Sequence, residues 1–189
     1  SDVIVNGTSS NVGGLVGELT YGGGLTDCWF DGTVSGSTYV GGLVGRTCAG
    51  DIKITGCLNS GMVSSTGLNC GGFIGFSQNY DGTAVTLSNS LNVGSVSSPD
   101  IVKTGALIGR VEGSLYVDQN SVHTVQSGLN YAFAWFAATL YDIDKNVIAN
   151  TGIENRSKYV PFTSLEDLKG EKATQNTGLV FDNPNTTDV

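Results

Sequence analysis

A short glycine-rich motif recurs four times along the chain. The segment GGLVG at residues 41–45 has counterparts that begin at Gly13, Gly71 and Gly105, separated by steps of 28, 30 and 34 residues. A period of this size is typical of stacked repeats, in which one unit cannot bury its apolar face alone. The motif therefore predicts a column of similar turns rather than a fold of unrelated elements.

Composition narrows the fold class to all-β. Of 189 residues, 28 are glycine and only 14% are charged, while the apolar residues are mostly β-formers. Units of about 30 residues made of short β segments would stack about 4.8 Å apart and pair from turn to turn in parallel sheets. We expect an all-β, parallel β-solenoid with repeats of 28–34 residues.

A second element follows each glycine motif by about a dozen residues. It occupies residues 25–34, 54–63 and 87–96, and a degenerate fourth copy falls around residues 117–126. Its glycine column predicts a turn with positive φ at one corner of each unit. The aligned columns are Leu25/Ile54/Leu87, Trp29/Leu58/Leu91, Gly32/Gly61/Gly94 and Val34/Val63/Val96.

The two motifs together resemble the GLUG repeat, a family named for its Gly-Leu-apolar-Gly core. Residues 57–64 and 90–97 also fit the small–apolar–Asn–x–Gly–x–Val–Ser pattern that follows this core in the family. The resemblance covers residues 1–127, with a partial first copy and a degenerate fourth. It implies a repeat region of a large secreted or cell-surface protein, such as an adhesin-like protein, and it brings no catalytic residues.

The chain divides into two segments of one domain. Residues 1–12 have the pattern of an incomplete repeat, so we expect a preceding turn in a longer protein. Residues 128–189 should form a cap over the open edge of the last turn. Within this cap, residues 131–138 are the most aromatic stretch, residues 163–170 predict one short helix, and residues 180–181 predict a last strand.

The charge balance excludes two kinds of partner. The net charge is −8 with nine Lys plus Arg, whereas phosphate binding needs clustered cations. An anionic membrane surface is disfavoured for the same reason. No apolar run approaches the roughly 20 residues that span a bilayer. We expect no nucleic-acid partner and no membrane insertion.

The sequence offers no catalytic set. His123, the single histidine, would have to act as the base for any Ser or Cys nucleophile, and we interpret it as a drifted repeat residue. Asp27 and Asp31 flank Trp29 and would suit a sugar, but their counterparts Gly56 and Ser60 favour turn residues. We expect no enzymatic activity and no cofactor.

Metal sites are equally disfavoured. Asp142, Asp144 and Asn146 open like a calcium loop, but Val147 and Ile153 stand where the EF-hand pattern needs Gly and Glu. We interpret this stretch as a solvated turn.

The four cysteines lack the spacing of a zinc site. Cys28 and Cys57 occupy equivalent positions, about 4.8 Å apart between Cα atoms if the turns stack, which is within disulfide range. Their parallel side-chain directions instead favour a column of small residues that Ser90 continues. We expect no bond between Cys48 and Cys70.

Three sequons, at Asn6, Asn155 and Asn185, would accept glycans in a secretory eukaryote.

The glycine motif carries apolar residues on both alternating faces, unlike a strand exposed on one side. One ladder should fill the core, and the other should need a cover from the C-terminal aromatic segment, another domain or a neighbouring subunit. The two ladders are Leu15, Leu43, Phe73 and Leu107, and Val16, Val44, Ile74 and Ile108.

These features together favour a non-enzymatic, extracellular structural or adhesive module of a large surface protein or filament. Its partners would be other domains or subunits packed on the repeat stack. Two alternatives stay open. One is a glycan-binding or carbohydrate-active β-helix that uses Trp29, Tyr39 and Tyr80. The other, which the resemblance to the GLUG repeat implies, is a stalk or accessory region of a secreted metallopeptidase.

Overall fold

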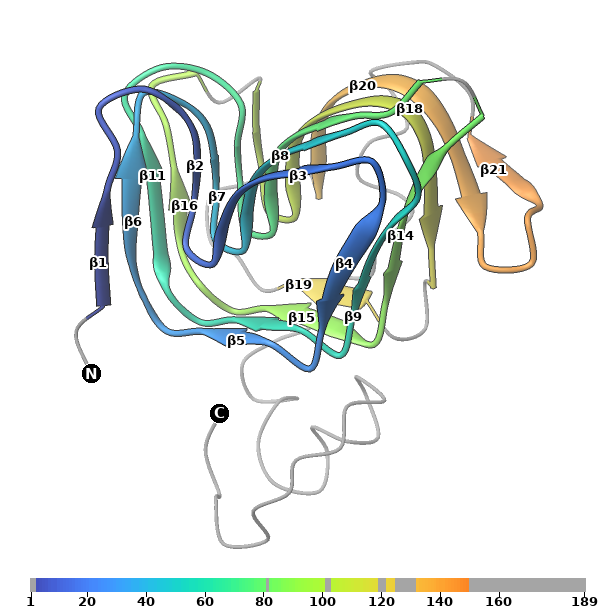
Figure 1. Ribbon diagram of the computed structural model, residues 1–189, viewed down its shortest axis with the longest axis horizontal. Helices are drawn as coiled ribbons and strands as arrows, with labels where there is room; N and C mark the ends of the chain where they lie inside the picture. The colour runs from blue at the N-terminus through green and yellow to red at the C-terminus, as the bar shows by residue number, and fades with distance from the viewer. Residues whose placement is uncertain (1–2, 81, 101–102, 119–121, 125–131, 150–189) are drawn as a thin grey trace, which may run out of the picture.

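The computed structural model describes residues 3–149, except residues 81, 101–102, 119–121 and 125–131. The chain forms a parallel β-solenoid of about four turns, as the repeat predicted (Figure 1). Among the described residues, no helix is long and apolar enough to cross a membrane. The predicted helix at residues 163–170 and the predicted strand at residues 180–181 lie outside the described part of the chain.

Three of the four sheets contain one strand from each turn. The side sheet contains β1 (Val3–Asn6), β6 (Gly32–Gly36), β11 (Met62–Ser65) and β16 (Val96–Ser97). The floor sheet contains β5 (Trp29–Phe30), β10 (Leu58–Asn59), β15 (Ser90–Asn92) and β19 (Val122–Thr124). The tip sheet contains β2 (Ser10–Gly13), β7 (Thr38–Gly41), β12 (Cys70–Gly71) and β17 (Thr104–Gly105).

The fourth, large sheet changes along the stack. In the fourth turn one long strand, β18, pairs with both β13 and β14 of the turn before. β20 then pairs parallel with β18, and β21 pairs antiparallel with β20. The strands are β3 (Val16–Thr20), β4 (Gly23–Thr26), β8 (Val44–Cys48), β9 (Ile52–Thr55), β13 (Ile74–Gln78), β14 (Ala84–Ser88), β18 (Ile108–Val117), β20 (Phe133–Asp142) and β21 (Val147–Ala149).

The C-terminal segment begins as part of the stack. Residues 133–138 of the aromatic stretch lie in β20, which covers the open edge of β18, as expected for a terminal element. β20 belongs to the same large sheet as the repeats, although it lies beyond the predicted repeat boundary at residue 127. The division into residues 1–127 and 128–189 stays a prediction.

The strand registers confirm the alignment of the repeats. The columns through Leu25, through Trp29 and through Val34 each pair residue by residue across consecutive turns. In the degenerate fourth copy, His123 pairs with Leu91 and Thr124 with Asn92. His123 therefore continues the Trp29 column, and Thr124 continues the column of Asn59 and Asn92.

The glycine motif folds inward. β7 ends at Gly41 and β8 begins at Val44, so the chain reverses within two residues and the tip sheet lies beside the large sheet (Figure 1). This reversal reaches the floor sheet, because a Cβ on Gly42 would lie 2.7 Å from the side-chain amide of Asn59. Each turn is therefore deeply indented, and in the first three turns glycine stands at the deepest point of the indentation.

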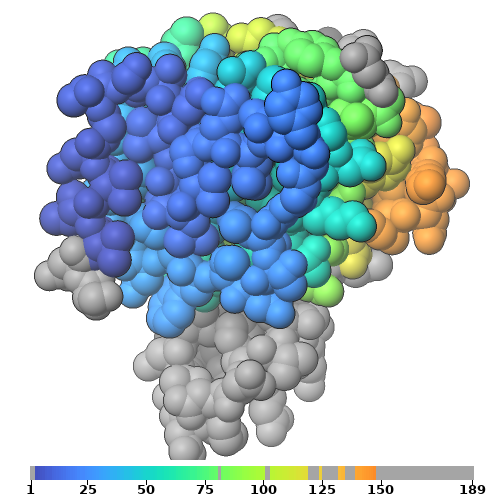
Figure 2. Space-filling model, viewed as in Figure 1, coloured from blue at the N-terminus to red at the C-terminus, as the bar shows by residue number. Residues whose placement is uncertain are grey.

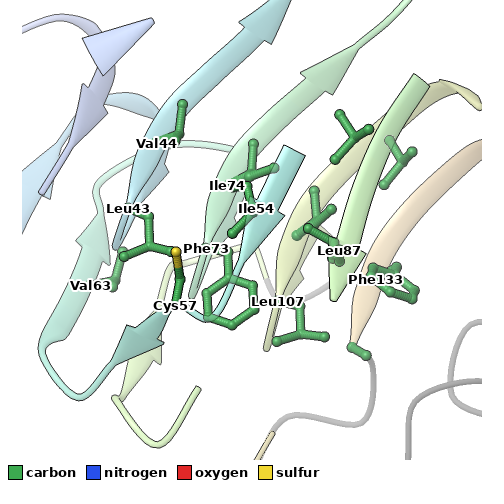
Figure 3. Packing of buried hydrophobic residues seen from close by; sticks show 14 of the residues in the cluster. Leu43, Val44, Ile54, Cys57, Val63, Phe73, Ile74, Leu87, Leu107 and Phe133 are labelled. Atoms are coloured by element: carbon green, nitrogen blue, oxygen red, sulfur yellow. The ribbon is translucent and has the colours of Figure 1, made fainter. Parts of the chain in front are cut away.

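The apolar core surrounds this indentation, and from the second turn onward the side chains of both ladders of the motif are buried in it (Figure 3). Leu43, Phe73 and Leu107 are fully buried, and so are Val44, Ile74 and Ile108. The expectation that one ladder needs a second cover is wrong, because the reversal between β7 and β8 directs both neighbours into the same apolar cluster. Leu15, in the first turn, keeps 41% of its surface exposed.

The positive-φ prediction for Gly32, Gly61 and Gly94 is also wrong. Positive φ occurs instead at other corners, formed by Asn11, Tyr39 and Asn69 and by Asp27, Gly56 and Asn89. At Gly61 a Cβ would lie 2.8 Å from the Gly32 nitrogen, and at Gly94 it would lie 3.0 Å from the Gly61 nitrogen. Close stacking of backbone on backbone, rather than an unusual φ, excludes a side chain in this column.

Candidate functional site

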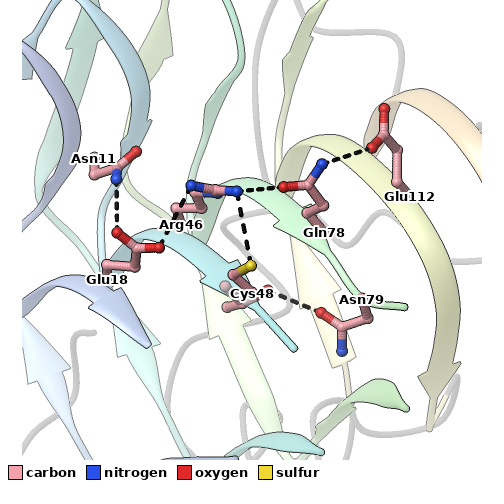
Figure 4. A network of polar contacts seen from close by, with 8 residues as sticks. Asn11, Glu18, Arg46, Cys48, Gln78, Asn79 and Glu112 are labelled. Atoms are coloured by element: carbon pink, nitrogen blue, oxygen red, sulfur yellow. Dashed lines mark hydrogen bonds and ion pairs between the residues drawn. The ribbon is translucent and has the colours of Figure 1, made fainter. Parts of the chain in front are cut away.

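A ladder of charged and amide side chains crosses the outer surface of the large sheet (Figure 4). Glu18 accepts hydrogen bonds from Asn11 Nδ2 at 2.8 Å and from Arg46 Nη1 at 3.4 Å. Arg46 Nη2 donates to Gln78 Oε1, and Gln78 Nε2 donates to Glu112 Oε2 at 3.2 Å. We call Asn11, Glu18, Arg46, Gln78 and Glu112 the polar ladder; it links all four turns.

An aromatic pair lies beside the polar ladder. The Phe76 ring is only 3% exposed and packs against the Tyr39 ring, with 4.9 Å between centroids. The guanidinium groups of Arg46 and Arg110 lie 5.8 Å and 4.9 Å from the Phe76 centroid. Cation–π contact with a desolvated ring stabilises both arginines. Because Tyr39 is in β7 and Phe76 is in β13, the pair fastens the two walls of the indentation.

The side chains of the polar ladder form hydrogen bonds and ion pairs with one another and with Arg110. Glu18 is paired with Arg46, and Glu112 is paired with Arg110 and with Gln78. A general acid or base needs a carboxylate that reaches a substrate proton, whereas both carboxylates here accept hydrogen bonds from neighbouring side chains. The arrangement is suited to fastening consecutive turns together.

A second ladder runs inside the floor sheet. Asn59 and Asn92 are fully buried, and Asn59 Nδ2 donates to Asn92 Oδ1 at 2.7 Å. Asn92 Nδ2 donates to the Ala106 carbonyl at 2.7 Å, which joins the floor to the inward reversal. Each side-chain oxygen also accepts from a backbone N–H two residues on, Gly61 and Gly94, at 3.2 Å. These bonds satisfy buried polar groups that would otherwise be costly.

The asparagine ladder explains one exception in the glycine motif. A Cβ on Gly72 would lie 2.6 Å from Asn92 Cγ, so glycine is required there. In the fourth turn Ala106 takes the place of this glycine, and Thr124 pairs with Asn92 in the floor register. In the fourth turn the floor sheet thus has threonine in place of asparagine, and the inward reversal has alanine in place of glycine. The asparagine at the same place in two copies is the sequence signal for this ladder.

The proposed sugar-site residues occupy a corner and the outer floor. Asp27 is exposed at φ 52°, in the same positive-φ column as Gly56, so the turn interpretation is confirmed for it. Ser60 Oγ donates a hydrogen bond to Asp31 Oδ1 at 3.1 Å. The same Ser60 Oγ accepts a hydrogen bond from the Trp29 indole N–H at 2.7 Å. Trp29 remains 63% exposed. The structure therefore joins Trp29 and Asp31 through Ser60 and leaves Asp27 at a separate corner.

The remaining predicted aromatics differ in exposure. Tyr39 is half-buried against Phe76, while Tyr80 is 50% exposed. Of the predicted interface residues only Leu15 is accessible in the folded chain. Asn6 is exposed at the end of β1 and accepts from Ser35 Oγ at 2.7 Å, and Asn155 and Asn185 lie outside the described residues.

The stretch from Asp142 to Asn146 is the turn between β20 and β21. Asp142 accepts hydrogen bonds from the Asn146 side chain and backbone N–H, each at 2.8 Å. The side-chain bond, followed by the backbone bond, lowers the pKa of the Asp142 carboxyl below its ordinary value. Within the described residues, no group of three or more His, Cys, Asp or Glu side chains is placed to hold a metal ion.

All four cysteines are free thiols. The column that contains Cys57 continues with Ser90, and Ser90 Oγ accepts a hydrogen bond from the Cys57 backbone N–H at 3.1 Å. The column of small residues is therefore confirmed. Burial raises the pKa of the Cys57 thiol to about 11 and that of Cys70 to about 12. Neutral, buried thiols are poor nucleophiles.

Fold and ladders together define a β-solenoid repeat protein, and one curated protein is similar to it in sequence. Halomucin of Haloquadratum walsbyi is 40% identical over 75 residues, which is 38% of this chain. The aligned part is 1% of the length of halomucin, so the similarity concerns a small piece of a very large protein. No family model matches the chain, and no solved structure matches it. Membership of the GLUG family stays a prediction.

Proposed function

We propose that this chain is a non-enzymatic structural repeat module of a larger extracellular surface protein. The observation that carries the proposal is the use of polar side chains within the stack. The polar ladder outside and the asparagine ladder inside both bind the next turn of the same chain. Side chains arranged in this way stabilise a column rather than approach a substrate.

Similarity to part of halomucin supports a repeat embedded in a very long chain. The low charged fraction, 14%, and the abundance of glycine are in keeping with a module whose stability comes from stacking. An adhesive role, or assembly into a filament, would use apolar groups that stay accessible in this chain, such as Leu15.

Two experiments test the proposal. The first incubates the purified full chain with panels of polysaccharides and peptides, and we expect no hydrolysis. Hydrolysis that disappears in Asp31→Asn, with unchanged unfolding in urea, would overturn the non-enzymatic assignment. The second treats intact source cells with a membrane-impermeant amine reagent, and we expect labelling of the exposed Lys53. Labelling of Lys53 only after lysis would overturn the surface location.

The exposed Trp29 ring favours a second candidate, glycan binding. Its indole N–H is held by Ser60 beside Asp31, so a flat apolar ring and a carboxylate face solvent together. Aromatic rings of this kind suit the apolar face of a sugar. A glycan array would compare the native chain with Trp29→Ala and with Tyr21→Ala, a control at a 90% exposed ring. Binding lost only in Trp29→Ala would support this candidate, and no binding by the native chain would dismiss it.

A further inference from the structure

Cys28 and Cys57 occupy corresponding positions in the first and second turns. Each precedes a strand of the floor sheet, and the residues that follow them, Trp29 and Leu58, are paired in register. The Leu58 backbone N–H donates to the Cys28 carbonyl at 2.9 Å. Neighbouring backbones in a sheet lie about 4.8 Å apart, so this is the spacing between the two cysteines.

The two thiols point in the same direction. The Cys28 thiol donates to the Thr26 carbonyl at 3.2 Å, and the Cys57 thiol donates to the Thr55 carbonyl at 3.3 Å. In the third turn Ser90 Oγ makes the same bond, to the carbonyl two residues before it, at 2.8 Å. Because the contact is the same in each turn, the two sulfur atoms repeat the spacing of the stack, about 4.8 Å.

The Cys57 sulfur faces the first turn from inside the core. It lies 3.5 Å from the Leu25 carbonyl of the first turn. Cys57 is fully buried in the apolar cluster (Figure 3), whereas Cys28 is partly buried and packs against that cluster. The pair is therefore dry on the Cys57 side and reached by solvent on the Cys28 side. Asp27, the exposed neighbour of Cys28, adds a negative charge that attracts a cation.

The sulfur spacing distinguishes among three uses of two thiols. A disulfide needs sulfur atoms about 2.05 Å apart, so its formation would require both side chains to move. A structural zinc ion takes four ligands, and the described residues contain no group of three or more His, Cys, Asp or Glu side chains placed for a metal. A cation midway between sulfur atoms about 4.8 Å apart has two bonds of about 2.4 Å, close to the length of zinc–thiolate bonds. The spacing therefore suits a two-coordinate ion that prefers sulfur.

We propose that Cys28 and Cys57 form a two-coordinate site for copper(I) that bridges the first and second turns. Copper(I) is a soft, closed-shell ion that prefers thiolate ligands and accepts two of them in a linear arrangement. Each thiol loses its proton to water on binding, so one Cu⁺ ion and two thiols give a bis-thiolate complex and two protons. The burial of Cys57 shields the bound ion from solvent.

Transfer of Cu(I) from a coloured chelator tests the site in the full chain. The probe is the Cu(I)–bicinchoninate complex, kept reduced with ascorbate without oxygen, and its loss of colour measures uptake by the protein. Cys28→Ser and Cys57→Ser should each weaken binding at least about 100-fold, because the second thiolate no longer acts at high effective concentration. Serine already occupies this column at Ser90, so both variants should keep the fold. The matched control is Cys48→Ser, at a partly buried thiol of β8, which should leave the affinity unchanged.

X-ray absorption spectroscopy of the loaded native chain reads the ligands directly. We expect two sulfur ligands at copper and no nitrogen ligand, a result that does not depend on how the variants fold. A nitrogen ligand, a third sulfur, or no uptake by the native chain would overturn the proposal. An affinity that stays unchanged in Cys28→Ser or in Cys57→Ser would overturn it as well, because other thiols would then bind the ion.

Discussion

The first and third turns contain the same glycine motif in very different surroundings. Leu15 is 41% exposed and Val16 is partly buried, whereas Phe73 and Ile74, their counterparts, are fully buried. β13 pairs with strands on both sides, β8 and β18, while among the described strands β3 pairs with β8 alone. The first turn accordingly lies at one end of the described stack (Figure 2). In a solenoid, the side chains of one turn are buried by the adjacent turns rather than by their own repeat.

The first turn also carries several exposed, large apolar side chains. Its large exposed apolar side chains are Val3, Ile4, Leu15, Tyr21 and Trp29. Open strand edges are ready templates for pairing with another chain. The contrast between the first turn and the third turn can be tested with matched substitutions.

The largest difference is expected for apolar truncation. Phe73→Ala should lower the free energy of unfolding by about 3–5 kcal/mol, because a fully buried ring is lost and a cavity remains. Leu15→Ala should lower it by less than about 1 kcal/mol, since that side chain already contacts water. Urea unfolding of the full chain measures both values. Equal losses would show that the first turn is covered in solution.

The second difference concerns buried amides. Asn92→Ala removes the donor to the Ala106 carbonyl and the acceptor for the Gly94 N–H, and should cost about 1–3 kcal/mol. Asn6→Ala removes an exposed bond to Ser35 in the first turn and should change stability by less than about 0.5 kcal/mol. Thermal and urea unfolding provide the comparison. An Asn92→Ala variant as stable as the native chain would show that the asparagine ladder does not hold the indentation.

The third difference is chemical reactivity in one column. Cys28 of the first turn is half-buried, while Cys57 of the second turn is fully buried with a pKa of about 11. We expect iodoacetamide to modify Cys28 at least about tenfold faster at about pH 8, as thiolate is the reacting form. Mass-spectrometric mapping over time measures the two rates. Similar rates would mean that the second turn opens as readily as the first.

The raised pKa of the Cys57 thiol predicts how the free energy of unfolding varies at alkaline pH. Burial favours the neutral Cys57 thiol in the folded chain, so its folded pKa lies above the ordinary value of 9.0. The resulting stabilisation is complete below about pH 9 and declines as the pH rises towards the folded pKa. Replacing Cys57 with Ser, its counterpart at Ser90, should remove the part of the alkaline decline that this thiol causes.

The smallest difference is expected at the polar ladder. Glu18 and Arg46 are 34% and 26% exposed, so water and salt weaken their attraction. Glu18→Gln should lower stability by no more than about 1 kcal/mol, and about 1 M NaCl should remove most of that difference. Urea unfolding at two salt concentrations is the measurement. A larger, salt-insensitive loss would show that Glu18 is more deeply embedded in the assembled protein.

The recurring motifs predicted much of the fold. The solenoid, its parallel pairing and the columns through Leu25, Trp29 and Val34 follow from two motifs that repeat in a fixed order. The polar ladder was harder to predict, because Glu18, Arg46, Gln78 and Glu112 differ in type from turn to turn. Side chains that complement one another across turns leave no repeated letter in the sequence.

The sequence by itself determined the period, the strand content and which residues stack on which, because these depend on local pattern and spacing. Only the tertiary structure decided the direction in which the glycine motif points. Once the motif turns inward against Asn59 and Asn92, both apolar ladders enter the core and glycine is required by close contact. Direction depends on which faces meet across the turn, and such contacts join residues far apart along the chain.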